Sequence, residues 1–119
     1  MERLRQRADF LAAAGGIKVP AATFVLQARD RRDLGPIRVG FTVSKKVGNA
    51  VERNRVRRRL REVVRLNSGD ALHPGHDYVL VGRRAALSAD FSALIEDYRR
   101  AIARLHAKRR SRSETSPNP

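Results

Sequence analysis

Alternation of apolar and polar residues predicts several short β-strands. The clearest runs from Arg38 to Ser44, where Val39, Phe41 and Val43 alternate with small or polar residues. The bulky face of this strand must be buried, whereas its small face either stays open to a close-lying ligand or packs under a loop. The same reading predicts further strands at 17–19, 23–29 and 77–83.

Apolar residues spaced three or four positions apart predict three helices. The middle one, at 50–66, has Val56, Leu60 and Val63 on one side, and the Asn-Ala-Val-Glu sequence at its start matches a capping box. The other two are a short amphipathic helix at 3–14 and a longer helix at 89–108.

These elements follow the order helix, strands, helix, strand, helix in a chain of 119 residues. Such a chain is too short for a doubly wound sheet, so the order indicates an α+β sandwich in which helices pack against one small sheet. We predict a single domain at 1–108. The remainder, 109–119, is basic and contains Ser and Pro, and we expect it to be a disordered tail.

Basic residues dominate the composition, with 26 Lys and Arg against 12 Asp and Glu, and the formal net charge is +14. Self-repulsion of this size destabilises a compact chain unless a polyanion neutralises it. Nucleic acid is therefore the leading predicted partner, and an acidic membrane surface is the second. The chain has no cysteine and no apolar run near the ~18 residues of a membrane span, so we expect a cytoplasmic protein.

The positive charge is concentrated between Lys45 and Arg65, where nine residues are Lys or Arg. The apolar side of the middle helix can anchor it while guanidinium groups opposite stay in water. Their planar fork suits phosphate oxygens and base edges. The alternative is a solvated charged face without a ligand. The candidate RNA-binding residues of this segment are Lys45, Lys46, Arg53, Asn54, Arg55, Arg57, Arg58, Arg61 and Arg65.

Two of the uncharged candidates also have ordinary interpretations. Asn54 is either a neutral exposed helix residue or a hydrogen-bonding partner for a sugar or phosphate. Phe10 either belongs to the core or stacks on an unpaired base. Aromatic residues make up only 5% of the chain, so we do not expect a broad stacking platform.

The sequence offers no catalytic group of its own. His73, His76 and Asp77 are close together, but the Pro-Gly between the histidines indicates a turn, and no fourth metal ligand is in register. Ser44 lacks a base that would activate it. Acidic residues are few and scattered, which argues against a two-metal nuclease centre built by the protein. The residues therefore predict binding to RNA or DNA without protein catalysis.

The segment from Val39 to Glu62, VGFTVSKKVGNAVERNRVRRRLRE, resembles the Arg-Asn-Arg signature of the bacterial ribonuclease P protein subunit. The resemblance continues at 8–10, 24–26 and 75–83 and covers residues 3 to 107. It implies the order α-β-β-β-α-β-α and a four-stranded mixed sheet. It also implies a left-handed βαβ crossover, as in the second domain of ribosomal protein S5, which runs against the general rule for such crossovers.

The resemblance also implies a function. The catalyst of the family is a large RNA with bound Mg²⁺, and the protein subunit binds that RNA and the 5′ leader of precursor tRNA. The holoenzyme cuts the leader off by endonucleolytic hydrolysis. The chain is thus expected to be an accessory subunit without catalytic residues, with Mg²⁺ bound mainly by the RNA, and with no membrane or obligate protein partner.

By position, the resemblance places the basic segment at the catalytic RNA or beside the leader path. It places Phe10, Thr42 and Arg83 in the cleft that takes the leader. Two aromatic positions of the family are occupied here by Ala14 and Gln27. We therefore expect weaker base stacking and a leader grip that depends more on charge and hydrogen bonds.

Two other classes of protein share parts of this pattern. Composition alone fits a ribosomal or ribosome-assembly protein equally well, although the Arg-Asn-Arg run argues against it. A helix-turn-helix DNA binder would also carry a basic helix. The element before the basic helix reads as a strand, however, which disfavours that class.

Overall fold

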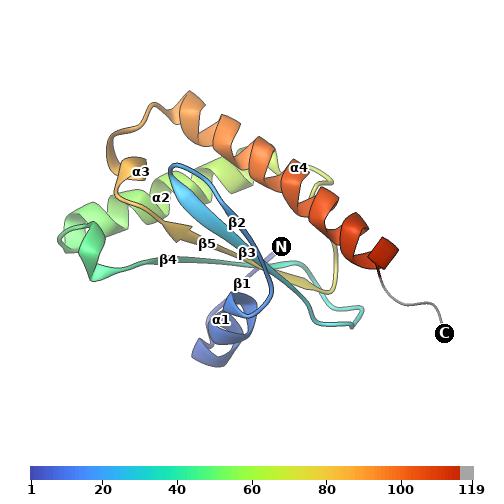
Figure 1. Ribbon diagram of the computed structural model, residues 1–119. Coiled ribbons are helices and arrows are strands. Elements are labelled where there is room, and N and C mark those ends of the chain that lie inside the picture. Colours follow the sequence, from blue (N-terminus) through green and yellow to red (C-terminus); the bar gives the residue numbers. More distant parts are fainter. Residues whose placement is uncertain (116–119) are drawn as a thin grey trace.

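A mixed five-stranded sheet in the order β1-β4-β5-β3-β2 lies at the centre of the fold (Figure 1). The computed structural model describes the backbone of residues 1–115 and the side chains of residues 1–109. The central strands β4 and β5 are parallel, and β1 also runs parallel to β4, whereas β3 pairs antiparallel with both β5 and β2. The strands are β1 (Glu2–Arg3), β2 (Ile17–Pro20), β3 (Phe24–Asp30), β4 (Arg38–Val43) and β5 (His76–Gly82).

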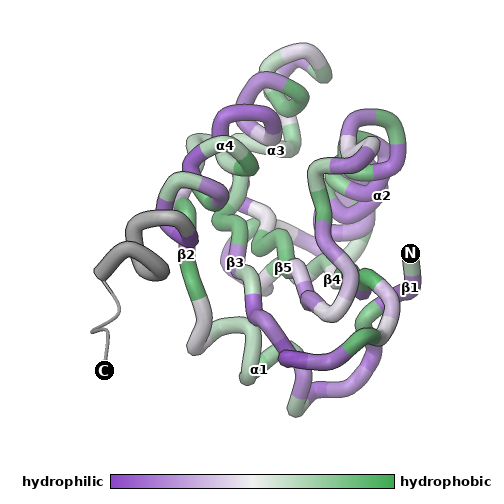
Figure 2. The backbone as a smooth tube through the Cα atoms, turned by 90° about the vertical axis from the view of Figure 1, so that its right-hand side faces the viewer, coloured by the Kyte–Doolittle hydropathy of each residue, from purple (hydrophilic) through white to green (hydrophobic). Residues whose placement is uncertain are grey.

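Helices cover the two faces of the sheet unequally. The long helices α2 and α4 pack on one face and against each other, while α1 alone lies under the other face (Figure 2). In the part of the chain that the structure describes, no helix is long and apolar enough to cross a membrane. The helices are α1 (Arg7–Ala14), the 3₁₀ turn η1 (Lys45–Val47), α2 (Ala50–Asn67), α3 (Ala85–Ser88) and α4 (Phe91–Thr115).

The alternation of side chains along the strands produces two cores of different size. On β5, Leu80 faces α2 and α4 in the main core, whereas Val79 faces α1 in a smaller cluster with Leu4 and Ala13. The main core takes buried residues from all of the sheet except β1, and from η1, α2, α3 and α4. The face under α1 is therefore the thinly covered one.

The predicted strands at 17–19, 23–29, 38–44 and 77–83 are confirmed within one residue at each end. The strand count of four is wrong, because Glu2 and Arg3 add a fifth strand to the edge of β4. The N–H groups of Glu2 and Leu4 donate to the carbonyl oxygens of Ile37 and Val39 at 2.7 and 2.9 Å. These bonds hold extended backbone where we had predicted a helix from residue 3, so α1 begins only at Arg7.

The middle helix and its capping box are confirmed. The Asn49 carboxamide oxygen accepts a hydrogen bond from the Glu52 N–H at 2.9 Å, and Glu52 Oε1 accepts one from the Asn49 N–H at 3.0 Å. The last helix starts two residues late and extends to Thr115, beyond the predicted end at 108. The predicted tail, 109–119, overlaps the end of α4, and its final part, 116–119, lies outside the described residues.

Candidate nucleic-acid-binding surface

Cations from two distant parts of the sequence meet at one edge of the sheet. Strands β4 and β5 are parallel neighbours with Val43 opposite Gly82, so the segments that follow them leave the sheet at the same edge. Lys45 and Lys46 follow β4 in η1, Arg83 follows β5, and all three side chains are exposed. This edge is also where α2 begins, so its first backbone N–H groups lie near the lysines.

Arg84 organises this edge, although sequence reasoning did not single it out. Its guanidinium donates to the carbonyl oxygen of Val47 and lies 3.9 Å from the carboxylate of Glu52 in the first turn of α2. Arg84 therefore ties the end of β5 to η1 and α2. The signal available in the sequence was its place directly after a predicted strand, next to Arg83.

Helix α2 is buried on one side and carries exposed arginines on the other. Val56 and Leu60 have no exposed surface, whereas Arg55, Arg58 and Arg61 are exposed. Arg55 and Arg58 make no ion pair or side-chain hydrogen bond with any described residue. The guanidinium of Arg61 lies 5.8 Å from the centre of the Phe41 ring, a distance at which a cation is attracted to an aromatic face. The α2 ridge, as we call Arg55, Arg58 and Arg61, thus presents charge that carboxylates of the described chain do not neutralise.

Other arginines of α2 are engaged within the protein. Arg59, which we had not selected, donates to the carbonyl oxygens of Ala86 and Leu87 at 2.9 and 3.1 Å and also to that of Ala89. It therefore holds the segment between α3 and α4. Arg57 donates to the side-chain oxygen of Asn54 at 2.8 Å, which gives Asn54 a structural role in addition to any contact with RNA.

Arg53 and Arg65 differ in whether their guanidinium groups have hydrogen-bond partners among the described residues. Arg53 Nε is buried and has no hydrogen-bond partner among the described residues. Arg65 pairs with Glu62 one turn earlier, with 3.1 Å between Nε and Oε2. The hydrogen bond raises the pKa of Arg65 and lowers that of Glu62. Within the described part of the chain, Arg65 is thus the one predicted RNA-binding residue of α2 that has an acidic partner.

The small face of β4 is partly covered by α1. A Cβ atom on Gly40 would lie 2.6 Å from the ring of Phe10, so only a glycine lets this ring rest on the strand. Phe10 is half-buried against the smaller cluster, and Thr42, on the same side of β4, is also half-buried. The ring of Phe10 therefore packs partly on the sheet, and its stacking on an unpaired base stays a prediction. Gln27 is half-buried on β3, which α1 also contacts.

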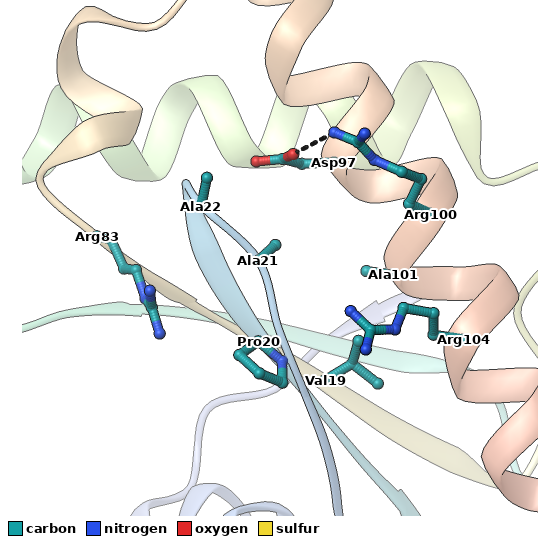
Figure 3. Close-up of a pocket in the computed structure, with 9 residues that line it drawn as sticks. All are labelled: Val19, Pro20, Ala21, Ala22, Arg83, Asp97, Arg100, Ala101 and Arg104. Atoms are coloured by element: carbon teal, nitrogen blue, oxygen red, sulfur yellow. Dashed lines mark hydrogen bonds and ion pairs between the residues drawn. The ribbon is translucent and has the colours of Figure 1, made fainter.

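Arg83 follows β5, the strand that pairs with the Thr42-bearing strand β4. It lines a cavity at the turn between β2 and β3, together with residues of α4 (Figure 3). The resemblance had grouped the three residues in one cleft. The structure brings Phe10 and Thr42 to the same sheet face and places Arg83 at the carboxyl end of the neighbouring strand.

Asp77, which the sequence pattern does not favour as a metal ligand, is a buried ion-pair partner. Its carboxylate has no exposed surface and accepts bonds from Arg38 Nε and Nη2 at 2.7 and 2.8 Å, and from Arg31. Burial alone would raise the pKa of Asp77, but the hydrogen bonds from Arg38 and Arg31 outweigh it and lower the pKa. Among the described residues, no group of three or more His, Cys, Asp or Glu could hold a metal ion.

A positively charged helical ridge on a mixed sheet, next to cations at the ends of two parallel strands, defines an α+β nucleic-acid-binding protein. Because η1 and a strand precede α2, the helix-turn-helix class does not fit.

Residues 1–106 match the sequence model of the family described as Ribonuclease P. The chain belongs to the ribonuclease P protein family.

Relatives and solved structures agree with this family. The chain is 54% identical over 108 residues to the ribonuclease P protein component of Ruegeria pomeroyi, covering 87% of this chain and 86% of that protein. It is 52% identical over 101 residues to that of Gluconacetobacter diazotrophicus, covering 84% and 87%. The structure of the Thermotoga maritima RNase P protein aligns with a TM-score of 0.73 at 31% identity, over 87% of this chain and 97% of that chain. The Staphylococcus aureus protein aligns with a TM-score of 0.73 at 26% identity, over 87% and 94%.

Proposed function

We propose that the chain acts as the protein subunit of ribonuclease P. In this role it binds the catalytic RNA and the 5′ leader of precursor tRNA, and it assists endonucleolytic removal of the leader. The observation that carries the proposal is the α2 ridge, whose guanidinium groups are held out from a buried stripe without carboxylate partners among the described residues. The names of the relatives support the same role.

The α2 ridge and the lysines of η1 would contact RNA phosphates. Arginine forks bind phosphate oxygens in pairs, and the ridge needs no rearrangement to expose them. Arg53 Nε is buried without a partner in the described chain, so an RNA oxygen would satisfy it only if this guanidinium turned outward on binding.

The leader would cross the sheet face that α1 covers only in part. Phe10 offers the accessible side of its ring to a base, and Thr42 offers a hydroxyl group beside it. Ala14 and Gln27 stand where many members of the family have aromatic residues, so a second stacking surface is missing. Charge at the adjoining edge, from Lys45, Lys46 and Arg83, would supply the remaining attraction.

Hydrolysis would be the work of the RNA and its metal ions. The donor set of the described chain does not suit Mg²⁺, because no group of three or more His, Cys, Asp or Glu residues could hold a metal ion. The buried carboxylates of Asp77 and Asp97 are already bound to arginines. We therefore place Mg²⁺ mainly on RNA phosphates, where bound ions can stabilise the attacking and leaving oxygens. The protein contributes binding, positioning and charge.

Two finer features belong to the same proposal. The left-handed crossover from β4 through α2 to β5 would place α2 on the face opposite α1, so that the ridge and the leader path flank the same sheet edge. The cytoplasm would be the place of action, because the proposed RNA partners are made there.

Reconstitution at low Mg²⁺ tests the proposal. The catalytic RNA alone should cleave precursor tRNA slowly under these conditions, and adding the protein should raise the rate, because it draws the leader to the RNA and reduces phosphate repulsion. A variant in which both Arg58 and Arg61 are changed to Ala should restore the rate poorly, whereas Arg99→Ala on α4 should act like the unchanged protein. No increase in cleavage on adding the unchanged protein would refute the proposed role.

A further inference from the structure

A second concentration of positive charge lines the cavity between the β2–β3 turn and α4 (Figure 3). The cavity has a volume of about 510 Å³. Arg100 and Arg104 reach it from α4, and Arg83 reaches it from the end of β5. The one acidic residue among the nine lining residues is Asp97.

The carboxylate of Asp97 is already fully engaged. Its Oδ2 accepts hydrogen bonds from the N–H and hydroxyl of Thr23 at 3.1 and 2.6 Å. Its Oδ1 accepts one from Arg100 Nη2 at 3.0 Å. Arg83 and Arg104 make no side-chain hydrogen bond or ion pair with any residue that the structure describes. The lining therefore includes two guanidinium groups without partners in the described chain, on either side of the β2–β3 turn (Figure 3).

Buried contacts hold the walls of the cavity in place. Thr23 is 3% exposed, and its carbonyl oxygen accepts a bond from the Arg83 N–H at 3.0 Å while its side chain binds Asp97. The ends of β5, the turn and α4 are thus tied together at one residue. Ala21, Ala22 and Ala101 form part of the lining and leave room for a ligand to approach the backbone. A ligand would meet a site that is already formed, which reduces the entropy lost on binding.

We propose that this cavity is a second phosphate-binding site, which takes phosphodiester groups of an RNA strand. Guanidinium forks match phosphate oxygens, and the volume exceeds that of one phosphate and accommodates the attached ribose. The nine residues drawn include no aromatic side chain, so the site binds the backbone and does not select bases. It shares Arg83 with the edge that the proposed leader path uses, lies apart from the α2 ridge, and requires no ribonuclease P RNA.

Titration of the free, isotopically labelled chain tests the site directly. The probes are a four-nucleotide single-stranded RNA and, separately, inorganic pyrophosphate, and the readout is the backbone amide signals of Ala21, Ala22 and Ala101. Both probes should shift these signals, and pyrophosphate should displace the RNA. Arg104→Ala should weaken RNA binding at these signals about tenfold. It should also reduce the slope of log K against log salt by about 0.7.

Arg99→Ala is the matched control, because it removes the same charge from a position of α4 five residues before Arg104. Arg99 is exposed, lies outside the cavity lining and contacts Asn67 at 3.4 Å. Its variant should leave the cavity signals and the salt slope unchanged. Thermal unfolding of both variants shows that each is folded.

Three results would contradict the proposal of a phosphate-binding site in this cavity. Equal losses in Arg104→Ala and Arg99→Ala would mean that only net charge matters. Shifts confined to α2 and η1 would mean that the cavity stays empty. Shifts with pyrophosphate but none with RNA would assign the cavity to small free phosphates and reject RNA. The α2 signals report on the ridge in the same spectra, so failure of the cavity and failure of the ridge are distinguishable.

Discussion

Helices α2 and α4 lie side by side on the same face of the sheet and use similar anchors for different purposes (Figure 1). Leu60 of α2 and Leu105 of α4 are both fully buried. Both helices carry many basic residues on their outer surfaces. They differ in what those residues contact.

The cations of α4 are mostly occupied within the described chain. Arg100 pairs with Asp97, Arg99 contacts Asn67, and Lys108 donates to the carbonyl oxygen of Lys18 at 2.6 Å. The guanidinium of Arg109 lies 5.6 Å from the centre of the Tyr78 ring. On α2, by contrast, the ridge has no acidic partner among the described residues. Charge that is free of internal partners, more than the number of basic residues, therefore distinguishes a surface for RNA from a surface that holds the fold.

The largest expected effect tests the shared part of the comparison. Leu60→Ala and Leu105→Ala should each lower the free energy of unfolding by about 2–5 kcal/mol, because each leaves a cavity in the main core. Urea denaturation measures both. If either variant lost less than about 1 kcal/mol, that helix would not be anchored as its burial indicates.

The next effect separates the acidic residues of the two helices. Asp97→Ala leaves the buried N–H and hydroxyl of Thr23 without their acceptor, and should cost about 1–3 kcal/mol of stability. Glu62→Ala on α2 is the matched control, since the Glu62 side chain is 44% exposed and binds only Arg65 among the described residues. It should unfold at nearly the same urea concentration as the unchanged protein. A reversed order would show that the ion pair on α2 matters more for folding.

Arginines of the two helices should differ in RNA binding. Arg58→Ala should weaken binding of the catalytic RNA and reduce the slope of log K against log salt by roughly 0.7–0.9, the amount for one lost phosphate contact. Arg61→Ala should behave similarly. Filter binding at several salt concentrations gives the slope.

Arg99→Ala supplies the control on α4, where the guanidinium contacts Asn67. Its slope should equal that of the unchanged protein. An unchanged slope in Arg58→Ala would mean that this residue touches no phosphate, and equal slopes for all three variants would remove the distinction between the helices.

Local sequence patterns were sufficient for most of the fold. Alternation along 38–44 and helical spacing along 50–66 are decided by burial on one side, which the sequence displays directly. The capping box needs only two residues three positions apart. The edge strand β1 could not be predicted in this way, because Glu2 and Arg3 are extended only through pairing with β4, far along the chain.

The partners of the arginines were also beyond sequence reasoning. The sequence shows seven arginines between Arg53 and Arg65 as equivalents, yet Arg59 binds backbone carbonyls near α3 and Arg65 binds Glu62. The contacts of Arg59 depend on where the segment after β5 passes, whereas Arg65 and Glu62 lie one turn apart on α2 itself. The same segment places Arg83 at the α4 cavity, and its place in a leader cleft with Phe10 and Thr42 stays a prediction. The sequence shows which residues are basic. It does not show which of them lack partners within the protein, because tertiary contacts decide that.

The smallest expected effect comes from a variant that removes the carboxylate partner of Arg65 on α2. Glu62→Gln removes the carboxylate that binds Arg65, whose side chain is 64% exposed, so stability should hardly change. RNA affinity should rise slightly, because the freed guanidinium joins the ridge and a negative charge is lost. Since the hydrogen bond from Arg65 lowers the pKa of Glu62, the carboxylate is ionised throughout the neutral range, and the gain should not vary with pH there.

The double variant Glu62→Gln with Arg65→Ala decides how that gain arises. If Arg65 gains a phosphate contact, the gain of the single variant should fall on adding Arg65→Ala, and the salt slope should fall with it. If the gain survives, loss of repulsion by Glu62 explains it and Arg65 stays outside the RNA contact. A decrease in RNA affinity for Glu62→Gln itself would show that the ion pair with Glu62 positions Arg65 for RNA. An arginine with a partner inside the protein would then also belong to the RNA-binding surface of α2.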